Sequence, residues 1–216
     1  MINLMVSSEK GSKNDIDLKR ANKQLIDCFE LDNKLFANLI NVEDIINYIS
    51  TNLLSIIQNN KRMKKKPSKD INEPLYSKLI PALSLEKYLI RIIKYTEVEN
   101  NTLIVAYLYI IKLIKKENFI LSINNIYRLL LGSVVLAKKV LEDLKYNNSY
   151  YCEIGGISLQ EFNKIEFSLF VRLNYEVNPK IEEIENVYKN IIDSLPQSKY
   201  RQYYYKLWKI IFVYIL

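Results

Sequence analysis

Apolar residues recur at helical spacing along most of the chain, and the first strong stripe begins at Val42, directly after an Asn that can cap a helix. Its members are Ile45, Ile46, Ile49, Leu53, Ile56 and Ile57. A second stripe follows Ser84, whose hydroxyl can cap a helix start, and a third begins at Asn100. Each of the three stripes predicts an amphipathic helix.

The segment from about Ser122 to Glu142 predicts a central helix, because residues 129–137 carry no charge and are apolar nearly all round. A helix of this kind has to be surrounded by others. Gly132, Ser133 and Ala137 lie on closely related faces, and such small residues let neighbouring helices approach at short distance.

Residues 146–156 are mostly polar and predict a joint, after which Ser158 and Glu161 stand at capping-box spacing. The helix expected there has an apolar stripe of Phe162, Ile165, Leu169 and Leu173. Glu166 lies beside that stripe at the spacing of one helical face. A carboxylate in this position is awkward if the face is wholly buried within the domain.

Pro179 opens another amphipathic segment that Pro196 ends, and a last helix is expected from Tyr200 to Leu216, whereas the first dozen residues are expected to be loose. The 216 residues contain four Gly and five Pro, too few for the tight turns of an all-β fold. The sequence therefore predicts an all-α protein.

A formal net charge of +7 makes the chain basic, but the cations are spread over many helix faces, so no nucleic-acid partner is expected. The exception is the run Lys61-Arg62-Met63-Lys64-Lys65-Lys66 before Pro67. It is interpreted first as an exposed linker. A nuclear-import signal or an acidic docking patch remains the alternative.

The sequence gives little indication of an enzyme, because it contains no His, no Gly-rich phosphate loop and no motif with the spacing of metal ligands. We expect no enzyme activity, no cofactor and no metal. The two isolated thiols, Cys28 and Cys152, and the absence of a secretory signal predict an intracellular protein of the nucleus or cytoplasm.

No transmembrane segment is expected, because the apolar run at residues 207–216 is about half of the roughly 20 residues that span a bilayer. A membrane-surface helix, favoured by its aromatic residues, stays open as a further alternative.

Four pieces of the sequence carry a resemblance to a known family: residues 84–95, 125–131, 136–143 and 147–166. The last piece is the most specific, with Asn147-Asn148, Gly155-Gly156-Ile157 and an Asn163 three residues before Glu166. The stretch from Ser84 to Tyr175 resembles the single cyclin box of Pho80-like, P/U-type cyclins. It departs from them at Ile111-Lys112, where Asp-Arg is usual, and at Tyr127, where His is usual.

The resemblance implies a five-helix cyclin box with additional N- and C-terminal helices. It divides the chain into an N-terminal extension (1–40), a preceding helix with a basic, Pro-containing linker (41–82), the cyclin box (83–177) and C-terminal helices (178–216).

The function implied is that of a regulatory subunit that binds and activates a cyclin-dependent protein kinase. In similar cyclins a Lys and a Glu contact the kinase where its mobile regulatory helix begins, and by motif position these are Lys139 and Glu166. Val140, Glu142 and Tyr175 fall at neighbouring kinase-facing positions. The alternative is a cyclin-box-like helical module that binds a partner other than a kinase.

Overall fold

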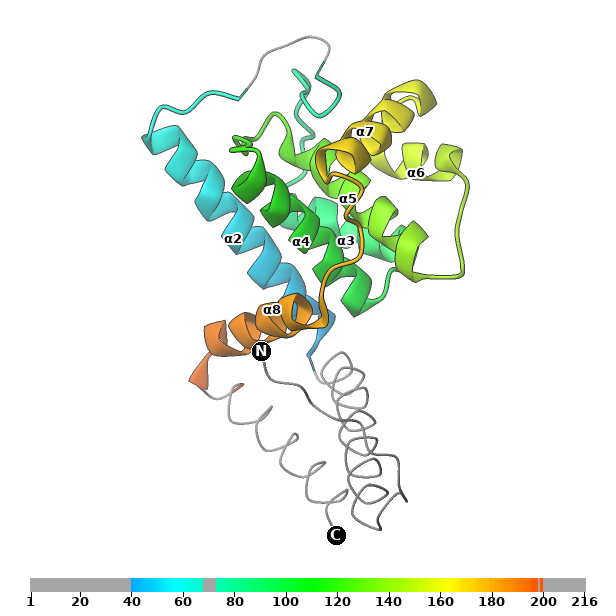
Figure 1. Ribbon diagram of the computed structural model, residues 1–216. Helices are drawn as coiled ribbons and strands as arrows, with labels where there is room; N and C mark the ends of the chain where they lie inside the picture. Colours follow the sequence, from blue (N-terminus) through cyan, green and yellow to red (C-terminus); the bar gives the residue numbers. More distant parts are fainter. Residues whose placement is uncertain (1–39, 68–72, 198, 200–216) are drawn as a thin grey trace, which may run out of the picture. The chain divides into compact units, whose positions relative to one another are not determined.

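The structure is a computed structural model that describes residues 40–67, 73–197 and 199, all within the second of the two units into which the chain divides. Among these residues every regular element is a helix, so the predicted all-α class is confirmed (Figure 1). The helices are α2 (Val42–Arg62), α3 (Leu85–Thr96), α4 (Asn100–Lys116), α5 (Ile126–Leu141), α6 (Asn148–Gly155), α7 (Leu159–Arg172) and α8 (Ile181–Ser194). The expected N-terminal extension and the expected last helix from Tyr200 lie outside the described residues.

The predicted capping residues begin three of the helices. The Asn41 side chain accepts from the amide of Glu43 at the start of α2, and Ser84 Oγ accepts from the amide of Lys87 at 3.2 Å at the start of α3. At α7 both halves of the capping box form between Ser158 and Glu161. These side chains satisfy backbone N–H groups that the first helical turn leaves without a partner.

Helix α5 is the centre of the fold and contacts α3, α4, α6 and α7 (Figure 1). It begins four residues after the predicted start, and residues 126–138 are all buried except Arg128. Gly132 lies where α7 crosses, because a Cβ there would stand 2.8 Å from Cγ2 of Ile165. The close approach expected from the small residues is therefore present.

The predicted joint at 146–156 instead contains a helix, α6, which Asn147 caps at its start and which Gly156 follows in the left-handed conformation (φ 65°). Tyr151, Cys152 and Ile154 bury their side chains and fix α6 against the core. A short helix with this polar composition has no clear apolar period, which is why the sequence pattern missed it.

The Pro-containing segment that follows the basic run is not a free linker over residues 74–77. The Leu75 side chain is fully buried. Arg128 donates to the carbonyl oxygens of Pro74 and Tyr76 at 2.9 and 3.1 Å, and Ser77 and Asn124 exchange two hydrogen bonds. Residues 61–66, by contrast, are exposed as expected.

Helices α2 and α8 flank the five-helix unit of α3–α7, and α8 contacts both α2 and α4. Lys112 pairs with Glu183 of α8 at 3.1 Å, so this cation finds its partner outside the five helices. The Tyr127 hydroxyl, where the resemblance would place His, donates to the carbonyl oxygen of Leu83 at 2.8 Å.

Candidate partner-docking site

Lys139 and Glu166, which the sequence analysis singled out, lie side by side. Lys139 is in the last turn of α5 and Glu166 is in the middle of α7, and their Nζ and Oε1 atoms are 2.5 Å apart. Their side chains are 28% and 20% exposed, so solvent and a partner protein can both reach the pair.

Two Asn residues that the sequence analysis did not assign to the interface complete this cluster. Asn148, at the start of α6, accepts from Lys139 Nζ at 2.7 Å and donates to Glu166 Oε2 at 3.2 Å. The same amide nitrogen donates to Oδ1 of Asn163 at 2.8 Å. The pieces at 147–148 and 163 carried the family resemblance, and that was the signal that could have marked them.

The cluster leaves hydrogen-bonding capacity for a partner. An ammonium group has three donors, and Lys139 uses one on Glu166 and one on Asn148. Each carboxylate oxygen of Glu166 accepts one hydrogen bond although it can accept two. As far as the described residues go, the arrangement can therefore donate one charge-assisted hydrogen bond and accept two more.

Glu142 was also predicted to lie in the interface, but its carboxylate faces the interior, where both of its oxygens have partners within the fold. It forms an i,i+4 ion pair with Lys138, and the two side chains are only 9% and 3% exposed. Its other oxygen accepts from the backbone amide of Glu99, the residue that precedes α4, at 3.0 Å. Glu142 therefore ties the end of α5 to the start of α4.

Exposed apolar side chains occur on two of the three helices that supply the cluster, α5 and α7, and on the residues that follow them. On and after the end of α5 they are Val140, Leu141 and Leu144, and on and after α7 they are Phe167, Val171 and Tyr175. Leu144, Phe167 and Tyr175 are the most open, at 82, 67 and 59% exposure. We call these six residues, together with Lys139, Asn148 and Glu166, the docking face.

Tyr175 has an uncommon backbone conformation, because both Asn174 and Tyr175 adopt the left-handed region, at φ 54° and 61°. Asn tolerates this region but an aromatic residue pays a steric cost there. The Tyr175 ring contacts Phe170 edge to face, with ring centroids 5.0 Å apart. The turn holds the ring beside α7 while leaving most of it exposed.

The sequence was compared with models of known protein families. A family model described as Cyclin matches residues 43–177, from the start of α2 to just beyond α7. The chain belongs to the cyclin family.

Curated relatives refine the kind of cyclin. Cyclin-U4-3 of Arabidopsis thaliana is 38% identical over 108 residues, which are 49% of this cyclin and 49% of that protein. Cyclin-U4-1 of the same plant is 40% identical over 100 residues, 45% and 49% of the two chains. PHO85 cyclin-like protein psl1 of Schizosaccharomyces pombe is 32% identical over 111 residues, 50% and 46% of the two chains. These relatives confirm the resemblance to P/U-type cyclins, and the chain spans about half the length of the curated relatives it matches.

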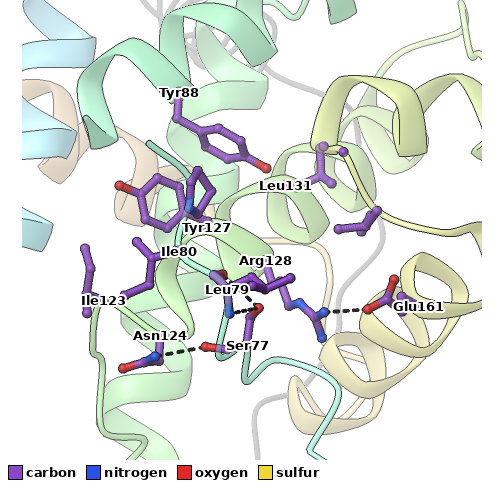
Figure 2. Close-up of a pocket in the computed structure, with 14 residues that line it drawn as sticks. Ser77, Leu79, Ile80, Tyr88, Ile123, Asn124, Tyr127, Arg128, Leu131 and Glu161 are labelled. Carbon is purple, nitrogen blue, oxygen red and sulfur yellow. Dashed lines mark hydrogen bonds and ion pairs between the residues drawn. The ribbon is translucent and has the colours of Figure 1, made fainter. Parts of the chain in front are cut away.

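This cyclin also has a hollow of about 360 Å³ between the segment before α3 and the helices α3, α5 and α7 (Figure 2). Figure 2 shows Arg128 extended toward Glu161, with Nη2 and Oε1 2.6 Å apart. Hydrogen bonds of the Ser158 amide and hydroxyl, followed by the nearby Arg128, lower the pKa of Glu161. The polar wall of this hollow thus holds α5, α7 and residues 74–76 together.

The described part of this cyclin contains no group of three or more His, Cys, Asp or Glu residues that could hold a metal ion. A search of the same residues finds no helix with the length and apolar content needed to cross a membrane.

Proposed function

We propose that this cyclin is the regulatory subunit of a cyclin-dependent protein kinase and that the docking face receives the kinase's mobile regulatory helix. The observation that carries the proposal is the cluster of Lys139, Asn148 and Glu166, whose spare donor and acceptors belong largely to α5 and α7, the helices on which or after which the exposed apolar side chains occur. The name of the yeast relative, a PHO85 cyclin-like protein, supports the assignment.

The two kinds of group on the face contribute differently to binding. Fully burying a Leu or Phe side chain is worth about 1.5–3 kcal/mol, whereas an exposed ion pair contributes about 0–1 kcal/mol. Leu144, Phe167 and Tyr175 therefore supply most of the affinity, because they have the most exposed area to lose. Lys139 and Glu166 fix the orientation of the partner through directional hydrogen bonds to its helix start.

Activation follows from binding one of two kinase states. The cyclin holds the regulatory helix inward, where its Glu pairs with the Lys that positions ATP, and the phosphoryl-transfer groups all belong to the kinase. Converting a kinase from about 1% to 99% active requires roughly 5.5 kcal/mol of differential binding. Burial of three apolar anchors, about 4.5–9 kcal/mol in all, is of this magnitude, so binding alone can supply the shift. Such a partner implies an intracellular location, in the nucleus or the cytoplasm.

The experiment is a charge reversal at the cluster, tested against the cyclin-dependent kinases of the source organism. In the double variant Lys139→Glu with Glu166→Lys the two side chains can still pair with each other, but each offers the partner the opposite charge. The matched control is Glu185→Lys with Lys189→Glu, which exchanges the same two charges one turn apart on α8, a helix that supplies no residue of the docking face. Binding affinity, kinase activity and the circular-dichroism melt are measured for all three proteins.

We expect the wild type and the control to bind and activate a kinase, and the cluster variant to lose at least about tenfold in affinity with an unchanged melt. Equal kinase binding by the cluster variant would contradict the assigned interface. If wild type binds no kinase but captures another protein through this face, the helical interaction module is the better assignment.

A further inference from the structure

One end of the described fold carries positive charge that no described acidic residue pairs with. Its cations belong to the last turn of α2, the turn after it and the last turn of α4: Lys61, Arg62, Lys64, Lys65, Lys66 and Lys115. All six side chains are exposed, and none forms an ion pair with another described residue. We call these six residues the basic end.

The basic end is assembled by two helices that run in the same direction. Helices α2 and α4 lie side by side (Figure 1), and the Tyr107 hydroxyl donates to Asn52 at 3.0 Å midway along them. Near their ends Asn60 donates to the carbonyl oxygen of Leu121 at 2.9 Å. The C-terminal ends of both helices, with their cations, therefore meet at one end of the fold.

The Lys139 cluster of the docking face lies at the other end of α4. The Glu142 carboxylate holds the end of α5, and with it Lys139, against the start of α4. Helix α4 has 17 residues. At 1.5 Å per residue it separates the two ends by about 25 Å. A partner on the basic end therefore leaves the Lys139 cluster free, whereas Tyr175 is adjacent to Glu176, which pairs with Lys116 in the last turn of α4.

Carboxylates near the end of α4 are already engaged by other cations. Arg172 pairs with both Glu117 and Glu73, and Lys116 pairs with Glu176. These acids therefore do not balance the charge of the six residues in the basic end.

Stabilisation of the helix ends explains the presence of only some of these cations. Cations in a last helical turn interact favourably with the helix dipole, and that accounts for Lys61, Arg62 and Lys115. Lys64, Lys65 and Lys66 lie beyond the helix, gain little from the dipole and repel one another.

The backbone presents these lysines in a defined geometry. The amide of Met63 donates to Asn59, that of Lys64 to Lys61 and that of Lys65 to Asn60, all at 2.9–3.1 Å. Lys64 adopts the left-handed conformation at φ 54°. The chain is thus wound as far as Lys65, so the cations form a surface patch rather than an extended peptide.

We propose that the basic end is a docking surface for an acidic segment of a partner protein, rich in Asp and Glu, which can be bound while the kinase contacts the Lys139 cluster. Six exposed cations that form no ion pair with a described residue are complementary in charge to a run of carboxylates. The simultaneous binding rests on the proposed function, but the acidic partner does not.

Two other anionic partners fit this surface less well. Single-stranded nucleic acid prefers basic grooves with aromatic side chains for base stacking, and none of the six residues or the intervening Met63 is aromatic. A membrane surface calls for an apolar helical face beside the cations, whereas the basic run offers only Met63, at 68% exposure.

The test measures binding of a fluorescein-labelled synthetic peptide of alternating Asp and Glu to the full chain by fluorescence anisotropy. The variant is Lys64→Gln with Lys65→Gln and Lys66→Gln. The matched control, Lys78→Gln with Lys87→Gln and Lys189→Gln, removes the same charge from exposed positions elsewhere. We expect the basic-end variant to lose about tenfold in affinity and the control to stay within about twofold of wild type.

Three results would overturn the proposal: no binding of the peptide by wild type, an equal loss in both variants, or tighter binding of single-stranded DNA or phosphatidylserine vesicles than of the peptide. A second measurement repeats the titration with the reconstituted kinase complex. Unchanged affinity there supports simultaneous binding, and displacement of the peptide by the kinase refutes it. If no kinase binds at all, the proposed function fails while the titration with the chain alone still decides the acidic partner.

Discussion

Removing the Glu142 carboxylate should strongly destabilise the fold, although the residue was predicted to be part of a surface. The change Glu142→Ala leaves the ammonium group of Lys138, whose side chain is 3% exposed, without its counter-charge. It also removes the acceptor of the Glu99 amide at the start of α4. Breaking a buried ion pair from one side costs about 3–5 kcal/mol, because a buried charge remains uncompensated.

That cost is a large part of the 5–15 kcal/mol that typically stabilises a domain. For a chain of this size each kcal/mol shifts the melting temperature by about 2–4 °C, so a decrease of roughly 10 °C is expected. The assay is urea unfolding and thermal melting followed by far-ultraviolet circular dichroism. The control is Asp143→Ala, because this neighbouring carboxylate is exposed and forms no ion pair with a described residue.

The double variant Lys138→Met with Glu142→Met removes both charges of the pair. It therefore distinguishes the effect of losing the ion pair from the effect of leaving the Lys138 ammonium buried without a counter-charge. Apolar residues of similar volume often replace a buried ion pair without loss, so this variant should recover most of the stability. The reasoning is refuted if Glu142→Ala stays within about 1 kcal/mol of wild type, or if the double variant is as unstable as the single one.

Three further predictions follow from the same contacts. Gly132→Val should lower the free energy of unfolding by about 1–3 kcal/mol in urea titrations, because its side chain meets α7; an unchanged value would show that the helices can separate. The pKa of Glu161 is lowered by hydrogen bonds from Ser158 and by Arg128, so its contribution to stability is present above the unfolded pKa of about 4.3 and lost as pH falls through the folded value. Glu161→Gln should therefore flatten the decrease in unfolding free energy between about pH 5 and pH 3, and an equally steep decrease would contradict the assignment. Asn148→Asp should weaken kinase binding about tenfold with less than about 1 kcal/mol loss of stability, and equal affinity in a binding titration would remove this residue from the docking face.

The sequence predicted helices well where local signals were complete. The caps at Ser84 and Ser158 and the charge-free stretch of α5 each depend on neighbours within one or two turns, and all three are present. Helix α6 was missed because Tyr151 and Ile154 gain their burial from the packing of distant helices, which no local period records.

The candidate site could be predicted only in part. The family resemblance indicated Lys139 and Glu166, and the structure brings them together. Whether Glu142 faces a partner or the interior depends on where the start of α4 lies, more than 40 residues earlier in the chain. Likewise, the burial of Leu75 depends on contacts of residues 74–77 with α5, which composition alone does not reveal.

Two neighbouring lysines at the end of α5 show how one helix separates stability from recognition. Successive residues on a helix are about 100° apart, so Lys138 points into the fold and Lys139 reaches α7 near the surface. The inner pair is nearly removed from solvent, and losing one partner is costly. The outer pair is partly exposed, and such pairs add little to stability. A charge reversal at Lys139 and Glu166 should therefore leave the fold intact, so that any kinase affinity it removes can be assigned to the interface itself.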